Sequence, residues 1–224
     1  MHWLSYSTPL LQGAWITAQL AAMSTLVGAA VSFALGLGRL AHNRLLRLSS
    51  IAVIELFRGT SLLVQLFWLY FALPVLGQAI GLDLRLPPVT AGVLALGLNI
   101  GAYGAEVVRG AVQAVPRSQH EAAKALDFTP WQIMWRIALP QAIPEMMPSF
   151  TNLAVQNLKD TALVSLISLG DLAFRAEQVR NYTQDSTTVY TLLLLMYFGM
   201  ALVLMAIMKT LERAVGRWRA VARS

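Results

Sequence analysis

The chain of 224 residues contains no cysteine and little charge. Without cysteine, neither disulfide bonds nor thiolate metal sites can form. Only 12% of the residues are charged, roughly half the fraction typical of a soluble domain, whereas 57% are hydrophobic. Together with a mean hydropathy of +0.59, this composition indicates an integral membrane protein.

Several functional motifs are also missing. No G-x-x-x-x-G-K-[ST] phosphate loop occurs, so we do not expect this chain to hydrolyse ATP. His2, His42 and His120 are scattered and form no metal-ligand cluster. The first basic residue after His2 is Arg39, so the first apolar segment lacks the charged leader of a secretory signal. We expect that segment to remain as a membrane span, in a protein that is not an enzyme and binds no metal or cofactor.

Long apolar runs follow one another along the chain. A transmembrane helix needs about 20 predominantly apolar residues, and five segments approach or exceed this length. The expected fold is therefore all-α, one polytopic membrane domain over residues 1–224. The five expected spans are residues 10–38, 51–76, 89–112, 146–168 and 189–208.

Basic residues are distributed unevenly among the loops. With the segment around Glu121 placed inside, the inner segments hold 11 of the 17 basic residues and the outer ones hold 3. This bias predicts an external N-terminus and a cytosolic C-terminus, and it assigns the net charge of +6 to orientation and lipid contact rather than nucleic acid. The inner set is Arg39, Arg44, Arg47, Arg117, Lys124, Arg136, Lys209, Arg213, Arg217, Arg219 and Arg223, and the outer set is Arg85, Arg175 and Arg180.

A polar, helix-forming stretch, residues 119–140, lies between the third and fourth expected spans. Ser118 and Glu121 have the spacing of a capping box, and Thr129 and Gln132 repeat it. These signals predict two short helices joined by a turn, a hairpin over residues 113–145. A rigid polar hairpin suits the docking of a partner, and an ordinary cytosolic loop is the alternative.

Prolines mark the expected helix ends in this region. Pro130 takes the favoured first position of the second short helix, and Pro140 is expected to end that helix. Pro140, Pro144 and Pro148 recur every four residues. We interpret them as helix breaks where the hairpin re-enters the membrane.

The third expected span has two opposed faces. Glycines at G-x-x-x-G spacing favour close helix contact on one face, which carries Gly97, Gly101 and Gly104. Asn99, Tyr103 and Glu106 lie on the other face and are expected along a solute path, because a carboxylate inside a span needs water or a partner. The alternative for Glu106 is a structural ion pair with Arg109, and Glu55 with Arg58 is expected to form such a pair.

The fourth expected span carries adjacent charges, Lys159 and Asp160. Neighbouring residues of a helix point about 100° apart, so these two side chains cannot pair well with each other. Each is expected to meet another group at membrane depth, where a zwitterionic solute could bind. The alternative is ion pairing with Glu106 or with a second copy of the chain.

The hairpin resembles a known motif. Glu121-Ala122-Ala123, followed by Ile137 and Leu139-Pro140, is similar to the EAA loop of ABC-importer permease subunits. In that family the first short helix docks into a groove of the ATPase and transmits its closure. The family usually has glycine where this chain has Asp127, at a helix end that often needs a left-handed residue. The resemblance implies that ATPase coupling involves Glu121, Ala122, Ala123, Asp127, Leu139 and Pro140.

Two further runs resemble the polar-amino-acid branch of these permeases, the histidine, glutamine and glutamate type. They are residues 158–164 and residues 55–65, where the branch usually has proline in place of Ser61. The resemblance places residues 158–164 at the centre of the permease, in contact with solute in some members. The runs 65–68 and 97–99, with Asp127, most resemble permeases for ectoine and hydroxyectoine. The candidate solute pathway is Asn99, Tyr103, Glu106, Lys159, Asp160 and Thr161.

The resemblance implies a multi-pass permease of a type I ABC importer in a bacterial inner membrane. Its implied partners are a second permease subunit, identical or homologous, ATPase subunits that carry ATP and magnesium, and a periplasmic or lipid-tethered solute-binding protein. Two other classes stay open: a gradient-driven secondary transporter using Glu106, Lys159 and Asp160, and a membrane scaffold that recruits a cytosolic protein through the hairpin.

Overall fold

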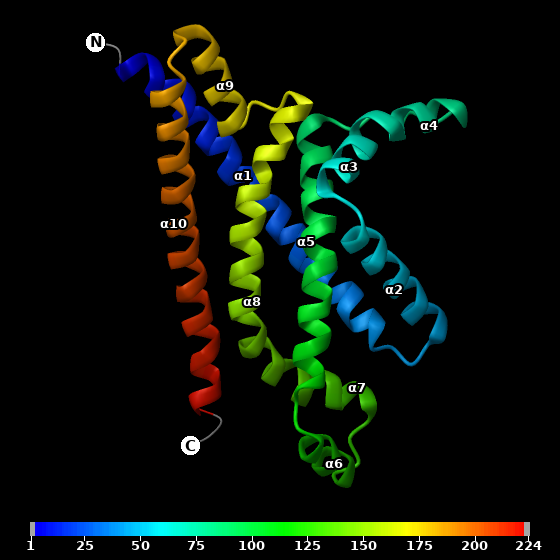
Figure 1. The fold of residues 1–224 in the computed structure, drawn as a ribbon. Helices are drawn as coiled ribbons and strands as arrows, with labels where there is room; N and C mark the ends of the chain where they lie inside the picture. Colours follow the sequence, from blue (N-terminus) through cyan, green and yellow to red (C-terminus); the bar gives the residue numbers. More distant parts are fainter. Residues whose placement is uncertain (1–2, 222–224) are drawn as a thin grey trace.

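The computed structural model describes the backbone of residues 3–221 and the side chains of residues 7–216. Within that range every regular element is a helix, which confirms the expected all-α class (Figure 1). The elements are α1 (Trp3–Arg39), α2 (Arg44–Gly59), α3 (Leu62–Phe67), the π-helix η1 (Trp68–Ala72), α4 (Leu73–Ala79), α5 (Pro88–Gln113), α6 (Arg117–Ala125), α7 (Pro130–Ile133), the π-helix η2 (Met134–Ala138), α8 (Leu139–Asp160), the 3₁₀-helix η3 (Thr161–Ile167), α9 (Leu172–Thr183) and α10 (Ser186–Val221).

Four helical stretches in the described part of the chain are long and apolar enough to cross a membrane: Ser7–Arg39, Leu62–Ala79, Pro88–Gln113 and Ser186–Gly216. They correspond to four of the five expected spans. The remaining one, residues 146–168, falls on α8 and η3, which pack beside α5 and α10 (Figure 1). Polar residues lower the hydropathy of α8, and it is not among the four stretches that are apolar enough to cross, so the fifth span stays a prediction.

The second expected span, residues 51–76, is not one helix. α2 ends at Gly59, and Thr60 and Ser61 adopt extended backbone angles before α3 begins. The predicted boundary is therefore wrong, and the apolar stretch starts at Leu62 instead. Glycine, threonine and serine are weak helix formers, and three in succession allow the chain to change direction here.

Glycines bring α1 and α5 into close contact along much of their length. A Cβ atom built at Gly97 would lie 2.8 Å from a methyl group of Val27, and one at Gly101 would lie 2.6 Å from a methyl group of Val31. Gly28 on α1 faces α5 in the same way. The predicted glycine face is thus confirmed, and its partner is α1.

We expect Gly101→Ala to destabilise the protein by about 1–3 kcal/mol, because overfilling a close helix contact displaces side chains or backbone. The added methyl group would also lie 3.3 Å from the Gly28 carbonyl oxygen. The unfolding temperature of the detergent-purified protein should fall. Gly110→Ala is the matched control on the same helix, since a Cβ atom there meets nothing within 4 Å. Equal unfolding temperatures for the two variants would contradict the close contact.

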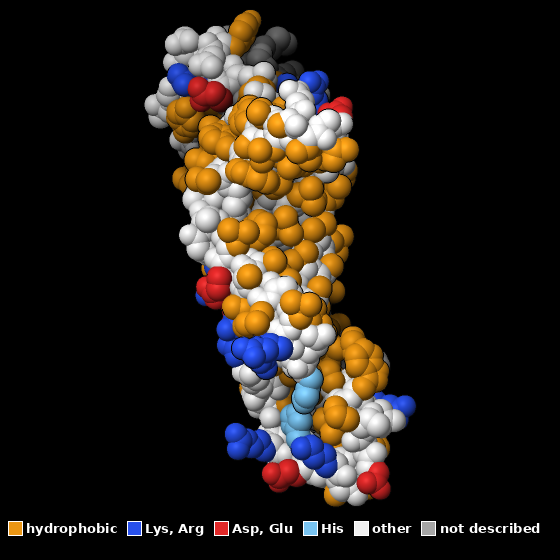
Figure 2. Space-filling view, turned by 90° about the vertical axis from the view of Figure 1, so that its right-hand side faces the viewer, with side chains coloured by type: hydrophobic (Ala, Val, Ile, Leu, Met, Phe, Trp, Pro, Cys, Tyr) orange, Lys and Arg blue, Asp and Glu red, His pale blue; other side chains and the backbone are white. Residues whose placement is uncertain are grey.

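The hairpin and the N-terminal end of α1 lie at opposite ends of the molecule, and α10 ends on the hairpin side (Figure 1). The space-filling view shows hydrophobic side chains across the middle and most charged ones toward the two ends (Figure 2). Both features suit a bundle that crosses a bilayer. At the end opposite the hairpin, Asp171 caps α9 by accepting hydrogen bonds from the backbone N–H groups of Ala173 and Phe174.

Candidate functional site

Only one of the two predicted capping boxes forms in the hairpin. The Thr129 hydroxyl accepts from the Gln132 N–H at 3.3 Å, and the Gln132 side chain accepts from the Thr129 N–H at 2.8 Å. The predicted box at Ser118 and Glu121 is wrong, because α6 already begins after Pro116. The extended backbone of that proline starts the helix two residues earlier than a Ser118 cap would.

The turn after α6 uses a left-handed residue, as the family pattern leads one to expect. Asp127 has φ 57°, and its N–H donates to the Lys124 carbonyl at 3.0 Å. The Phe128 N–H donates to the Ala123 carbonyl at 3.1 Å. These two bonds form a Schellman motif, the common end of a helix at a left-handed residue. Asp127 therefore makes the turn that glycine would make, at the steric cost of a Cβ atom.

The hairpin has polar and apolar side chains that no other part of the single chain covers. Glu121 and Ala122 are exposed, whereas Ala123 is 2% exposed and faces the helices beneath α6. Leu126 and Trp131 are 71% and 69% exposed. Large apolar side chains beside exposed polar ones are typical of a surface that binds another protein.

The hairpin continues into the bundle without a helix break. α7, η2 and α8 follow one another directly, so the predicted helix end at Pro140 is wrong. Leu139 is buried and Pro140 exposed in the first turn of α8, and the π-helical turn before them re-registers the backbone hydrogen bonds. Pro144 and Pro148 lie inside α8 and are not the predicted breaks. Their four-residue spacing puts the missing N–H groups on one side, and the rest of the helix continues.

A cavity of about 310 Å³, here called the central cavity, lies between α3, α5 and α8. Asn99 lies near the middle of α5, and Asp160 is the last residue of α8. Residues far apart in the sequence therefore meet beside the middle of α5. The lining residues are Leu62, Leu96, Asn99, Ile100, Tyr103, Leu153, Gln156, Asn157 and Asp160.

Three of the six predicted pathway residues line this cavity: Asn99, Tyr103 and Asp160. Thr161 is fully buried and its hydroxyl donates to the Leu158 carbonyl at 2.6 Å. Lys159 is exposed on the chain and is not part of the cavity lining. The structure thus separates Lys159 from Asp160, as the helical geometry predicts.

Hydrogen bonds hold the amide nitrogens of the central cavity within the protein. Gln156 Nε2 donates to Asp160 Oδ1 at 2.9 Å. Asn157 Nδ2 donates to the hydroxyl oxygens of Ser24 and Thr25 on α1, at 2.7 and 3.0 Å. The oxygens of these amides and of Asp160 are therefore acceptors beside the cavity, and Gln156 Nε2 keeps one further N–H.

Asn99 follows the same pattern. Its Nδ2 donates to Gln65 Oε1 at 3.1 Å and to the Phe57 carbonyl at 3.3 Å. None of the described residues that line the central cavity is lysine or arginine. Amide oxygens together with the Asp160 carboxyl group suit a solute group that donates hydrogen bonds and carries positive charge, such as an ammonium group.

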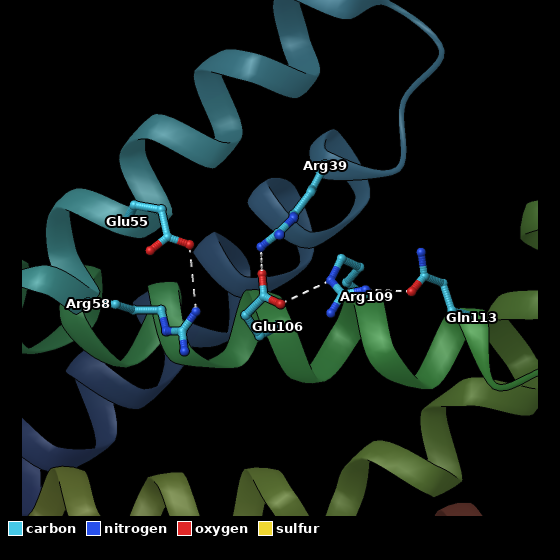
Figure 3. Close-up of polar contacts among 6 residues, drawn as sticks. All are labelled: Arg39, Glu55, Arg58, Glu106, Arg109 and Gln113. Atoms are coloured by element: carbon cyan, nitrogen blue, oxygen red, sulfur yellow. Dashed lines mark hydrogen bonds and ion pairs between the residues drawn. The ribbon is translucent and has the colours of Figure 1, made fainter.

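Glu106 lies on the hairpin side of the central cavity and joins two helices. One of its carboxylate oxygens accepts from Arg39 at the end of α1, and the other accepts from Arg109 Nε at 2.9 Å (Figure 3). The ion pair with Arg109 is the structural alternative that the sequence offered, and Glu106 is held by these arginines rather than by Lys159. Arg39 is 67 residues away in the chain and has no sequence signal that links it to Glu106.

Glu106 also lines a second cavity of about 520 Å³, here called the hairpin-side cavity, with Gln141, Glu145 and Ser149 of α8. Tyr103 lines the central cavity one turn of α5 before Glu106. The Arg58 guanidinium lies 5.5 Å from the centre of the Tyr103 ring. The predicted pair of Arg58 with Glu55 is present at 3.9 Å (Figure 3). Along α5, the predicted polar face therefore runs from the central cavity toward the hairpin.

The sequence reasoning missed Gln65, Gln156 and Asn157. Each is an amide side chain in or beside an expected span, and this is a signal that could have identified them. The partners of Asn157 lie on another helix and those of Gln65 across a helix break, which no local pattern reveals, whereas Gln156 binds Asp160 one turn along α8.

Comparisons with known proteins show the family of the chain. The family described as "Binding-protein-dependent transport system inner membrane component" matches residues 14–217. The "Probable amino-acid ABC transporter permease protein y4tF" of Sinorhizobium fredii (strain NBRC 101917 / NGR234) is 64% identical, over 98% of this chain and 92% of its own length. The "Glutamine transport system permease protein GlnP" of Escherichia coli (strain K12) is 30% identical over 91% of each chain.

Solved structures show the same fold. A chain from the "Crystal structure of an amino acid ABC transporter with histidines" has a TM-score of 0.83 and 31% identity, covering 94% of this chain and 96% of that chain. A chain of the inward-facing "MetNI methionine ABC transporter" has a TM-score of 0.77 at 21% identity, covering 94% and 98%. The chain therefore belongs to the inner-membrane permease family of binding-protein-dependent ABC transport systems.

Proposed function

We propose that this chain forms, with a second permease subunit, the pathway of an ATP-driven importer for a polar amino acid delivered by a solute-binding protein. Its family makes it a multi-pass permease component of an amino-acid ABC importer in the inner membrane, and not an enzyme. The proposal adds to this the identity of the solute, its delivery by a solute-binding protein and ATP as the source of energy. The names of the relatives, which mention amino acids, glutamine and histidines, support this class of solute.

The central cavity is the observation that carries the proposal. Its volume of about 310 Å³ suits a small solute. It combines an apolar wall with a carboxyl group and amide oxygens, so it can receive an ammonium group that has lost its water. We assign solute contact to Asn99, Tyr103 and Asp160, with Glu106 farther along the path.

The hairpin supports the link to an ATPase. Glu121 and Ala122 are exposed on α6, at one end of the bundle, and the continuous helix from α7 into α8 leads from there to Asp160. Closure of two ATPase subunits around ATP and magnesium would draw the α6 helices of two permeases together. A rigid connection of this kind can carry that movement to the central cavity.

Lys159 supports the second permease subunit. It is exposed in the single chain, next to Asp160 and therefore at the depth of the central cavity. A cation at that depth is costly against lipid, so we place a second permease subunit or the shared water-filled path beside it.

Reconstitution tests the function directly. We expect affinity purification from native membranes to recover an ATPase and a solute-binding protein with this chain. Liposomes that contain the complex, with the binding protein outside and ATP inside, should then accumulate radiolabelled L-amino acids. Accumulation that continues after ATP removal, under a maintained proton or sodium gradient, would identify a secondary transporter instead. Competition by unlabelled ectoine in the same assay tests the ectoine prediction from residues 65–68 and 97–99.

A further inference from the structure

The break between α2 and α3 leaves backbone carbonyl groups of α2 without helical partners beside α5. α2 ends at Gly59, and Thr60 and Ser61 are extended. The break lies beside Asn99, near the middle of the α5 span. Carbonyl groups at the end of a helix need donors from outside that helix.

Gln65 supplies those donors. Its Nε2 lies 2.8 Å from the Phe57 carbonyl oxygen, 3.1 Å from the Thr60 carbonyl oxygen and 2.9 Å from the Thr60 hydroxyl. The side chain is 8% exposed, although it belongs to an apolar membrane-spanning stretch. A buried amide in such a segment is retained at a cost, so its hydrogen bonds must matter to the protein.

The other end of the Gln65 amide fixes Asn99. Gln65 Oε1 accepts from Asn99 Nδ2 at 3.1 Å, and the second hydrogen of that Asn99 group points to the Phe57 carbonyl at 3.3 Å. With both amide hydrogens directed at the break, Asn99 Oδ1 is the polar atom left to the central cavity. Two acceptors therefore orient Asn99, Gln65 Oε1 and the Phe57 carbonyl, and Gln65 also holds the Phe57 carbonyl through its own Nε2.

We propose that Gln65 is a positioning residue, which holds the Asn99 side-chain oxygen toward the central cavity and thereby favours solutes that present an ammonium group there. The preference for such solutes rests on the proposed function. The orientation of the Asn99 side chain does not, because it can be measured without a transported solute. Without Gln65, the Asn99 amide can turn and present its NH₂ group, which repels a cationic donor.

The absence of cysteine gives a test that needs no solute. Leu153 lines the central cavity, so Leu153→Cys places a single thiol there. In the purified transporter complex, its reaction rates with a cationic and an anionic methanethiosulfonate reagent are followed by the mass of this chain. We expect the cationic reagent to react faster, and Gln65→Leu to lower the ratio of the two rates by about threefold or more.

A double-mutant comparison separates positioning from simple destabilisation. Asn99→Leu should lower the rate ratio by itself, and adding Gln65→Leu should then change it no further. A loosened structure would raise both rates together and leave their ratio constant. Gln78→Leu is the matched control, because Gln78 is exposed on α4 and should keep the ratio of the parent.

Uptake by the reconstituted complex gives the second readout. With a radiolabelled mixture of L-amino acids, Gln65→Leu should raise the half-saturating concentration more than it lowers the maximal rate. If the variant keeps both the rate ratio and the half-saturation of the parent, or if its effects add fully to those of Asn99→Leu, the inference is overturned. Failure of the parent complex to import any amino acid, with the expected rate ratios intact, would instead reject the proposed function.

Discussion

Changing Glu121 to lysine is expected to abolish ATP-driven uptake while the protein still inserts in the membrane. Glu121 is exposed on α6 and makes no ion pair within the described part of the chain, so the fold does not depend on its charge. In the proposed complex the same surface docks into the ATPase. Reversing a charge in such an interface should weaken ATPase binding by about tenfold or more.

The measurement combines co-purification of the ATPase with uptake in liposomes. Gln119→Lys is the matched control: it adds the same side chain to the same helix, two residues away and therefore about 200° around the helix axis. We expect that variant to retain the ATPase and most of its uptake. Normal uptake by Glu121→Lys would remove the coupling role of α6. Equal loss in both variants would show general sensitivity of the hairpin to positive charge.

Local patterns in the sequence were sufficient wherever one segment determines its own structure. The capping box at Thr129 and Gln132 forms because its donors and acceptors lie within one helical turn. The left-handed turn at Asp127 follows from the geometry of a helix end. The glycine face of α5 was visible because helical periodicity brings Gly97, Gly101 and Gly104 to one side. None of these features requires knowledge of distant residues, although the partner α1 was unknown.

Predictions failed where helices far apart in the sequence, or competing local signals, decide the outcome. Arg39 holds Glu106 across 67 residues, and no pattern connects the two. Pro140 looks like a helix end, yet the preceding π-helical turn carries the helix past it. The change of direction at Thr60 leaves carbonyl groups that a side chain later in the sequence, Gln65, satisfies. At Glu106 the local pair with Arg109 forms and Arg39 is an added partner, whereas at Pro140 and Thr60 the local rule is outweighed by an irregular turn or a tertiary contact.

Asp160→Asn is expected to lower uptake by about tenfold or more without releasing the ATPase. The central cavity has one carboxyl group among its described lining residues, and asparagine has nearly the same shape without the charge. The side-chain oxygen of the introduced asparagine can still accept from Gln156 Nε2, so the local hydrogen bond is preserved. What is lost is the attraction between a carboxylate and an ammonium group in a partly dehydrated site.

The effect should appear mainly in the half-saturating concentration, and a higher solute concentration should restore part of the rate. Asp83→Asn is the matched control, since it makes the same chemical change in an exposed loop outside the membrane-spanning helices and should leave uptake unchanged. Loss of the ATPase from purified Asp160→Asn complexes would instead mean that Asp160 holds the structure together. In that case the charge serves the contact between helices, and solute recognition must lie with other residues of the pathway.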